Sequence, residues 1–148
     1  MHCFLARSFL LGAVIGMLPG CGQRSATVIS TPTAAQVSQF VRQANLTLPA
    51  SAQATGWQEE RGMDNARWLQ VRMPKPDLQG FLDRSPFRGA ELTTNNQYLI
   101  SAFREFLPKP PARYRAGQQS LPNARTLNMV IDETEPAKVV VYLMWHET

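Results

Sequence analysis

Apolar residues recur at helical spacing in the first third of the domain. Those nearest its start lie three or four positions apart: Ala34, Val37, Phe40, Val41 and Ala44. This spacing is typical of one face of an amphipathic helix. Thr33 followed by Gln36 resembles a capping box, in which each side chain accepts a backbone N–H of the other residue. The pattern therefore predicts a helix over residues 33–44.

Two more stretches have the same spacing. Residues 76–84 open with a proline and contain the apolar set Leu78, Phe81 and Leu82. Further along, Thr94 and Gln97 are spaced to cap a helix whose apolar face would be Leu99, Ala102, Phe103 and Phe106. Pro108 would end that helix. We therefore expect two or three helices in all.

Four segments alternate in polarity or are rich in β-branched and aromatic residues: 52–60, 66–73, 125–132 and 137–146. Such segments predict strands, and turn residues join the first two and the last two into hairpins. The proline-rich residues 109–123 between them predict a long loop. The fold class is therefore α+β, with a mostly antiparallel four-stranded sheet from two hairpins and the helices packed on one face.

Alternation assigns ten strand residues to the core face: Leu69, Val71, Met73, Leu127, Met129, Ile131, Val139, Val141, Leu143 and Trp145. The opposite face would carry Trp68, Arg72, Tyr142, Met144 and His146. An antiparallel sheet with one solvated face has polar residues on that face. These five residues therefore predict either an exposed binding surface or a second face that a helix or the long loop covers.

The predicted loop contains a basic cluster formed by Lys109, Arg113, Tyr114 and Arg115. Arginine forks bind carboxylates and phosphates, and neighbouring prolines lower the entropy lost on docking. The cluster is a candidate contact for an acidic partner or for lipid headgroups. In the alternative interpretation the loop is solvated and Tyr114 packs into the core.

The N-terminal segment predicts a targeting signal. Arg7 precedes ten apolar residues, 9–18, which are too few to cross about 30 Å of hydrocarbon as a helix, since that needs about 20. The segment is therefore a signal and not a membrane span. Its end, Leu18-Pro19-Gly20-Cys21, resembles the lipobox of bacterial lipoproteins, with Pro19 departing from the usual small residue.

This resemblance implies that signal peptidase II cleaves before Cys21, whose thiol carries diacylglycerol. The expected organisation is a lipoprotein signal peptide over residues 1–20, a lipidated tether over 21–31 and a single α+β domain over 32–148. Gly22 resembles the outer-membrane sorting pattern of bacteria with two membranes. The domain would then face the periplasm, whereas in a host with one membrane it would face outward.

Composition restricts the class of partner. The net charge of +4 is mild, and the Lys and Arg residues form none of the clusters that are typical of nucleic-acid binders. Cys3 lies in the signal and Cys21 would be acylated, so the processed protein would contain no disulfide. The expected partners are the membrane, through the acyl chains on Cys21, and an envelope protein or an acidic polymer.

The sequence contains no catalytic or cofactor motif that we can identify. His146 and Glu147 are too few ligands for zinc, and the acidic turn containing Asp132, Glu133 and Glu135 is best explained as a solvated tip, with a weak calcium site as the alternative. We therefore expect no cofactor and no metal.

These observations favour a lipid-anchored binding module of the cell envelope, of which an inhibitor or immunity-type lipoprotein is one form. Two alternatives remain at this stage. One is an envelope hydrolase that uses His146, and the other is a structural component of envelope assembly.

Overall fold

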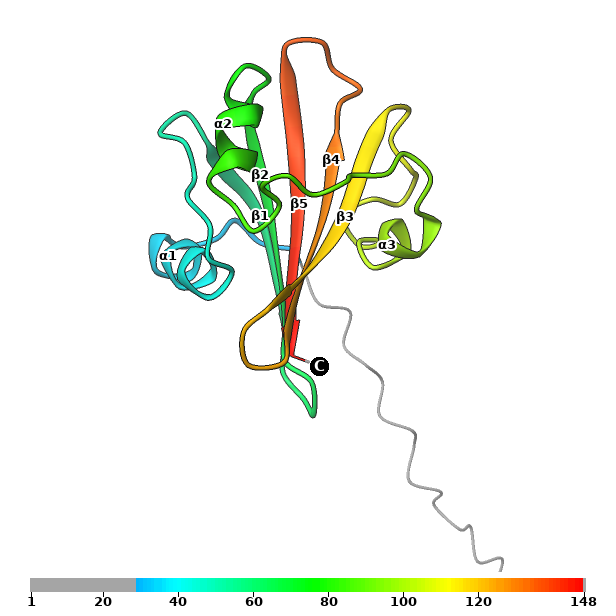
Figure 1. The fold of residues 1–148 in the computed structure, drawn as a ribbon. Helices are drawn as coiled ribbons and strands as arrows, with labels where there is room; N and C mark the ends of the chain where they lie inside the picture. The colour runs from blue at the N-terminus through cyan, green and yellow to red at the C-terminus, as the bar shows by residue number, and fades with distance from the viewer. Residues whose placement is uncertain (1–28, 148) are drawn as a thin grey trace, which may run out of the picture.

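The computed structural model describes residues 29–147, so the predicted signal and Cys21 lie outside the described residues. Within this range five antiparallel strands form one sheet, in the order β1-β2-β5-β4-β3 (Figure 1). The strands are β1 (Gln53–Glu60), β2 (Ala66–Pro74), β3 (Tyr114–Leu121), β4 (Arg125–Asp132) and β5 (Lys138–Glu147). The α+β class and the antiparallel sheet are confirmed.

The sheet consists of a hairpin joined to a three-stranded meander. β1 pairs with β2, β3 pairs with β4, and β4 pairs with β5. The two parts meet where β2 pairs with β5 along nine residues, from Ala66 opposite His146 to Pro74 opposite Lys138. β5 is therefore the central strand, in agreement with its run of β-branched and aromatic residues.

The fifth strand, β3, corrects the prediction of a loop over residues 109–123. It pairs with β4 from Tyr114 opposite Asp132 to Leu121 opposite Arg125. Ala116 and Gly117 are its buried residues, and the other six are polar or partly exposed. An edge strand with so few large apolar residues lacks the alternation by which the other strands were predicted.

Helix α1 (Ala34–Gln43) confirms the first predicted helix and its capping box. The Thr33 hydroxyl accepts the Gln36 N–H at 3.2 Å, and the Gln36 side chain accepts the Thr33 N–H at 2.8 Å. Helix α2 (Asp77–Asp83) buries Leu78, Phe81 and Leu82, as its spacing predicted. None of the helices described is long and apolar enough to span a membrane.

Helix α3 (Gln97–Ser101) is shorter than predicted. Asn96, and not Thr94, caps it by accepting the Leu99 N–H at 3.0 Å. Turns with short-range backbone hydrogen bonds continue the chain through residues 102–106. Together, α3 and these turns form a compact layer over residues 97–107, which we call the α3 layer.

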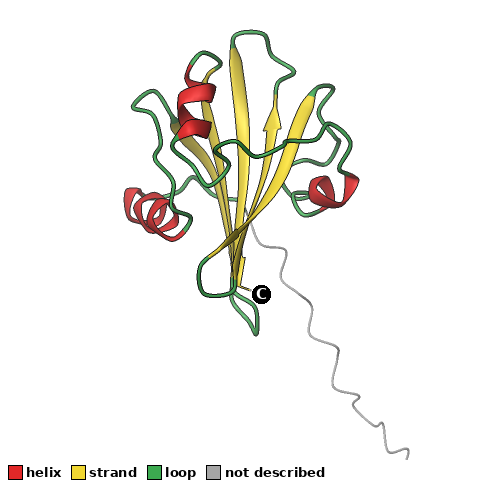
Figure 2. Cartoon of the chain, in the orientation of Figure 1, coloured by secondary structure: helices red, strands yellow, loops and turns green. Residues whose placement is uncertain are grey.

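The helices lie on both faces of the sheet, which corrects the expectation that they pack on one (Figure 2). α1 and α2 cover the first face, whose core includes all ten residues that alternation assigned to it. The α3 layer covers part of the second face and forms a smaller core with Trp68, Val130 and Tyr142. The covered second face, one of the two alternatives, is therefore the observed one.

Each edge of the sheet is paired at one point. Ser30 and Trp57 exchange two backbone hydrogen bonds on the β1 edge, at 3.1 and 2.7 Å. On the β3 edge Thr93 and Ala116 do the same, at 2.9 and 2.8 Å. Pairing of this kind reduces the length of bare edge that another strand could join.

Candidate binding pocket

The α3 layer changes the interpretation of the second face. Trp68 and Tyr142 are 8% and 7% exposed, Met144 and His146 are half-buried, and Arg72 is exposed. Of the two alternatives for these five residues, the fully exposed surface is therefore not the one observed. Alternation placed them on a common face correctly, but it could not show that the apolar side chains of residues 97–107 pack over part of it.

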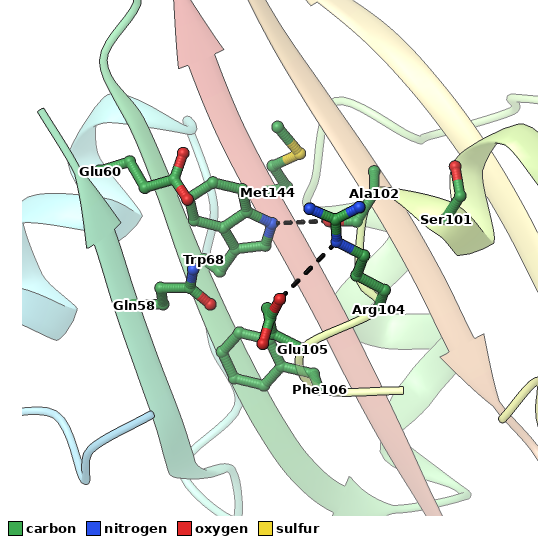
Figure 3. Close-up of a pocket in the computed structure, with 9 residues that line it drawn as sticks. All are labelled: Gln58, Glu60, Trp68, Ser101, Ala102, Arg104, Glu105, Phe106 and Met144. Atoms are coloured by element: carbon green, nitrogen blue, oxygen red, sulfur yellow. Dashed lines mark hydrogen bonds and ion pairs between the residues drawn. The ribbon is translucent and has the colours of Figure 1, made fainter. Parts of the chain in front are cut away.

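A pocket of about 210 Å³ remains beside the last turns of the α3 layer (Figure 3). Its lining combines β1, β2 and β5 with residues 101–106: Gln58, Glu60, Trp68, Ser101, Ala102, Arg104, Glu105, Phe106 and Met144. Trp68 and Met144 belong to the five predicted surface residues. The pocket is thus what remains accessible of the predicted surface.

Two aromatic side chains form walls of the pocket. The Trp68 indole N–H donates to the Ala102 carbonyl at 3.0 Å, which ties β2 to the α3 layer. Phe106 meets the Tyr142 ring edge to face, with ring centroids 6.3 Å apart. It also lies against Gly56, where an added Cβ would come within 2.8 Å of the Phe106 ring. Phe106 can approach the sheet this closely because residue 56 has no side chain.

The buried end of the pocket contains an unpaired polar group. Gln58 lies opposite Trp68 in the β1–β2 pairing and is 4% exposed. Its carboxamide oxygen is buried and has no hydrogen-bond partner among the described residues. Leaving a buried acceptor unpaired costs about 1–3 kcal/mol, and most such groups in native proteins have a partner. The unpaired Gln58 oxygen is therefore an energetically unfavourable feature of this pocket.

Charged side chains surround the opening. Glu60, Arg104 and Glu105 are exposed, and Arg104 Nε lies 3.6 Å from Glu105 Oε1. The two side chains of this pair are 80% and 55% exposed, so the ion pair is weak. Two carboxylates and one guanidinium leave the rim with one excess negative charge.

The predicted basic loop is not a free loop, because Tyr114 and Arg115 belong to β3. Arg115 makes a two-point ion pair with Glu133, at 2.9 and 3.2 Å. Arg113 donates to the Thr134 carbonyl at 3.3 Å, and Tyr114 packs against the second core. The alternative in which Tyr114 packs inward therefore agrees with the structure, and Lys109 is exposed.

The other predicted chemical residues lie apart from the pocket. His146 Nδ1 is 3.2 Å from the Glu147 carbonyl oxygen. Asp132 accepts the Thr134 N–H at 2.8 Å, and Glu133 is paired as described above. Residues 29–147 contain no group of three or more side chains positioned to hold a metal ion.

Sequence reasoning missed Gln58 and Phe106. Gln58 lies in a segment that was predicted as a strand, but a polar residue there gives no sign that it is buried. Phe106 was assigned to a helical apolar face, whereas it lies in a turn after α3. Its contact with Gly56 joins residues 50 positions apart, and no local pattern predicts such a contact.

Comparisons with protein-family models, with curated proteins and with solved structures gave no match.

Proposed function

We propose that this chain is a lipid-anchored binding module of the cell envelope, which holds a group of its partner in the pocket beside the α3 layer. The observation that carries the binding role is the buried, unpaired carboxamide of Gln58 in this pocket. A ligand with a hydrogen-bond donor would satisfy it. An inhibitor or immunity-type lipoprotein remains one form of such a module.

The anchoring role depends on the lipobox-like end of the signal, Leu18 to Cys21. Two or more acyl chains on one cysteine hold a protein stably at a membrane, whereas one chain binds marginally. The proposed location is the cell envelope, at the outer membrane facing the periplasm in a host with two membranes. Ser30, on the β1 edge, is where the tether would join the folded domain.

Metabolic labelling tests the anchor. The wild-type chain expressed in a bacterial host should incorporate labelled palmitate, and mass spectrometry should find Cys21 as the first residue of the mature protein. The matched variant Cys21→Ser should take up no label. A mature N-terminus at any other residue would contradict the proposal.

Blocking the pocket tests the binding role. Ser101 is exposed and lines the pocket, so Ser101→Trp should fill it. Ser38 is exposed on α1, on the other face, and Ser38→Trp is the matched control. Partners crosslinked to the anchored protein in its native envelope should be lost with Ser101→Trp and kept with Ser38→Trp. Glu105→Lys replaces the pocket variant if Ser101→Trp does not fold.

Two other results would favour the alternative functions. Partners that both Trp variants retain would contradict the pocket and favour a structural component. An activity that His146→Ala abolishes would favour an envelope hydrolase. The geometry supports that alternative less well, because within residues 29–147 no carboxylate is hydrogen-bonded to the His146 ring.

A further inference from the structure

We infer that the pocket binds an organic cation, an ammonium or guanidinium group on a short chain, such as a basic side chain of the partner. This inference rests on the proposed function and names the chemical class of the ligand. It follows from the size of the pocket, from the direction of its hydrogen bonds and from its charge.

The size restricts the ligand to a single chemical group. Pockets for drug-sized molecules have volumes of about 300–1,000 Å³. The pocket here, at about 210 Å³, is smaller than that range. It therefore fits one side chain or a small amine better than a whole metabolite.

Two hydrogen-bond donors in the pocket wall are already in use. The Trp68 indole N–H is donated to Ala102, and the Ser101 hydroxyl donates to the Tyr98 carbonyl at 2.7 Å. The lining also offers acceptors, namely the unpaired Gln58 carboxamide oxygen and the Glu60 carboxylate at the rim, while the Glu105 carboxylate is paired with Arg104. Ammonium and guanidinium groups carry donors and no acceptor, so they can donate to these acceptors.

Charge and aromatic walls favour the same ligand. The rim carries one excess negative charge, since Arg104 offsets one of the two carboxylates. Trp68 and Phe106 form walls, and a cation is attracted to the face of an aromatic ring. A neutral donor of the same shape would gain the hydrogen bond to Gln58, but it would gain neither the attraction to the negative rim nor the attraction to the aromatic rings.

Titration of the protein tests the inference through the Trp68 indole N–H signal in NMR spectra, because this group lies in the pocket wall. The probes are Nα-acetyl-lysine methylamide, its arginine counterpart and butylamine. The neutral control is the lysine probe acetylated on its side chain. The charged probes should shift the Trp68 signal to saturation, with an affinity at least about tenfold higher than that of the neutral control.

The three charged probes also distinguish the sources of the cation. Tighter binding of the two amino-acid amides than of butylamine indicates a side chain of a protein partner. Equal binding of all three indicates a pocket that recognises the cationic group alone. Both results support the inference, whereas equal binding of the neutral control would overturn it.

Variants assign the contacts. Gln58→Met removes the carboxamide at similar volume, so it should abolish binding of the lysine probe without lowering the thermal midpoint of unfolding. The double change Glu60→Gln and Glu105→Gln should weaken binding about tenfold. Glu91→Gln, an equivalent change of an exposed carboxylate that does not line the pocket, should leave binding unchanged.

Three outcomes would reject the inference: no shift of the Trp68 signal up to about 10 mM probe, unchanged binding by Gln58→Met, or unchanged binding by the double variant. If the probes fail while Ser101→Trp still loses the crosslinked partner, the pocket binds a different chemical group and the proposed function stands. If both experiments fail, the pocket has no binding role.

Discussion

At Gly56 the α3 layer approaches the sheet closely. A Cβ built there would lie 2.7 Å from Gln70 Oε1 and 2.8 Å from Phe106 Cε1. Real Cβ atoms essentially never make contacts this short, so a side chain at residue 56 must displace its neighbours. The Gln70 carboxamide ends a flexible side chain and can move, but the Phe106 ring is part of the pocket wall.

Gly56→Ala should therefore destabilise the domain by about 1–3 kcal/mol, as overpacking does elsewhere, and should push Phe106 outward. The free energy of unfolding in urea measures the effect. Gly62→Ala is the matched control, because a Cβ there has no neighbour within 4 Å, and it should change stability by less than about 0.5 kcal/mol. Equal effects of the two substitutions would mean that Phe106 does not lie against Gly56.

Tyr142 predicts how stability depends on alkaline pH. Burial and, to a smaller extent, the Asp132 carboxylate raise the pKa of Tyr142 to about 12, although the Arg72 guanidinium opposes this shift. An unfolded tyrosine loses its proton near pH 10. The folded state therefore holds this proton more tightly than the unfolded state. Its contribution to stability is constant below about pH 10 and falls as the pH rises toward about 12.

Tyr142→Phe should remove this dependence. The urea midpoint of the wild-type protein should fall more steeply between about pH 10 and pH 12 than that of the variant. Comparing the two pH slopes, rather than the absolute stabilities, separates the loss of the proton from any change in packing. Parallel slopes would show that Tyr142 is not buried as described.

At the scale of elements, the sequence predicted those helices and strands whose own residues form a clear pattern. α1 has a capping box and an apolar face, and β2 and β5 alternate clearly, so all three agree with prediction. β3 was missed because its buried positions are Ala116 and Gly117, which make no apolar pattern. Pairing with β4 determines its conformation, and such pairing is visible only in three dimensions.

The difference between local patterns and contacts of distant segments also explains which pocket residues were predicted. Alternation placed Trp68 and Met144 on one face, and both line the pocket. The contributions of Gln58 and Phe106 depend on contacts between β1 and the α3 layer. These contacts join distant parts of the chain, so a pattern within either segment could not indicate them.

Two substitutions test which residue caps the N-terminus of α3. Asn96→Ala removes the acceptor for the Leu99 N–H and should cost about 1 kcal/mol of stability, as loss of a helix cap typically does. Thr94→Ala changes the residue that the sequence predicted as the cap and should have little effect. Both are measured by urea unfolding. A larger loss for Thr94→Ala would mean that the helix begins where the sequence predicted.

The whole molecule is a sheet between two unequal cores. The core under α1 and α2 includes eighteen buried residues, and the core under the α3 layer includes nine. Since burial of apolar area is the main stabilising term, the α3 layer should be the less stable of the two. A layer of this kind can open locally while the sheet remains folded.

Native-state hydrogen exchange should detect this difference. Backbone amides bonded within the α3 layer, such as those of Ala102 and Leu107, should exchange through local opening faster than those of the β2–β5 pairing. A ligand in the pocket should slow their exchange, because it contacts residues 101–106. Uniform protection across the domain would indicate that the two layers unfold together.

The pairing of Ser30 with Trp57 also limits how far the domain could lie from a lipid anchor at Cys21. Ser30 is the first residue that this pairing holds against the domain, and it lies nine residues after Cys21. At about 3.3–3.6 Å per residue, the chain between them can extend about 30 Å at most. In the proposed anchored protein, Ser30 would therefore stay within about 30 Å of the bilayer surface.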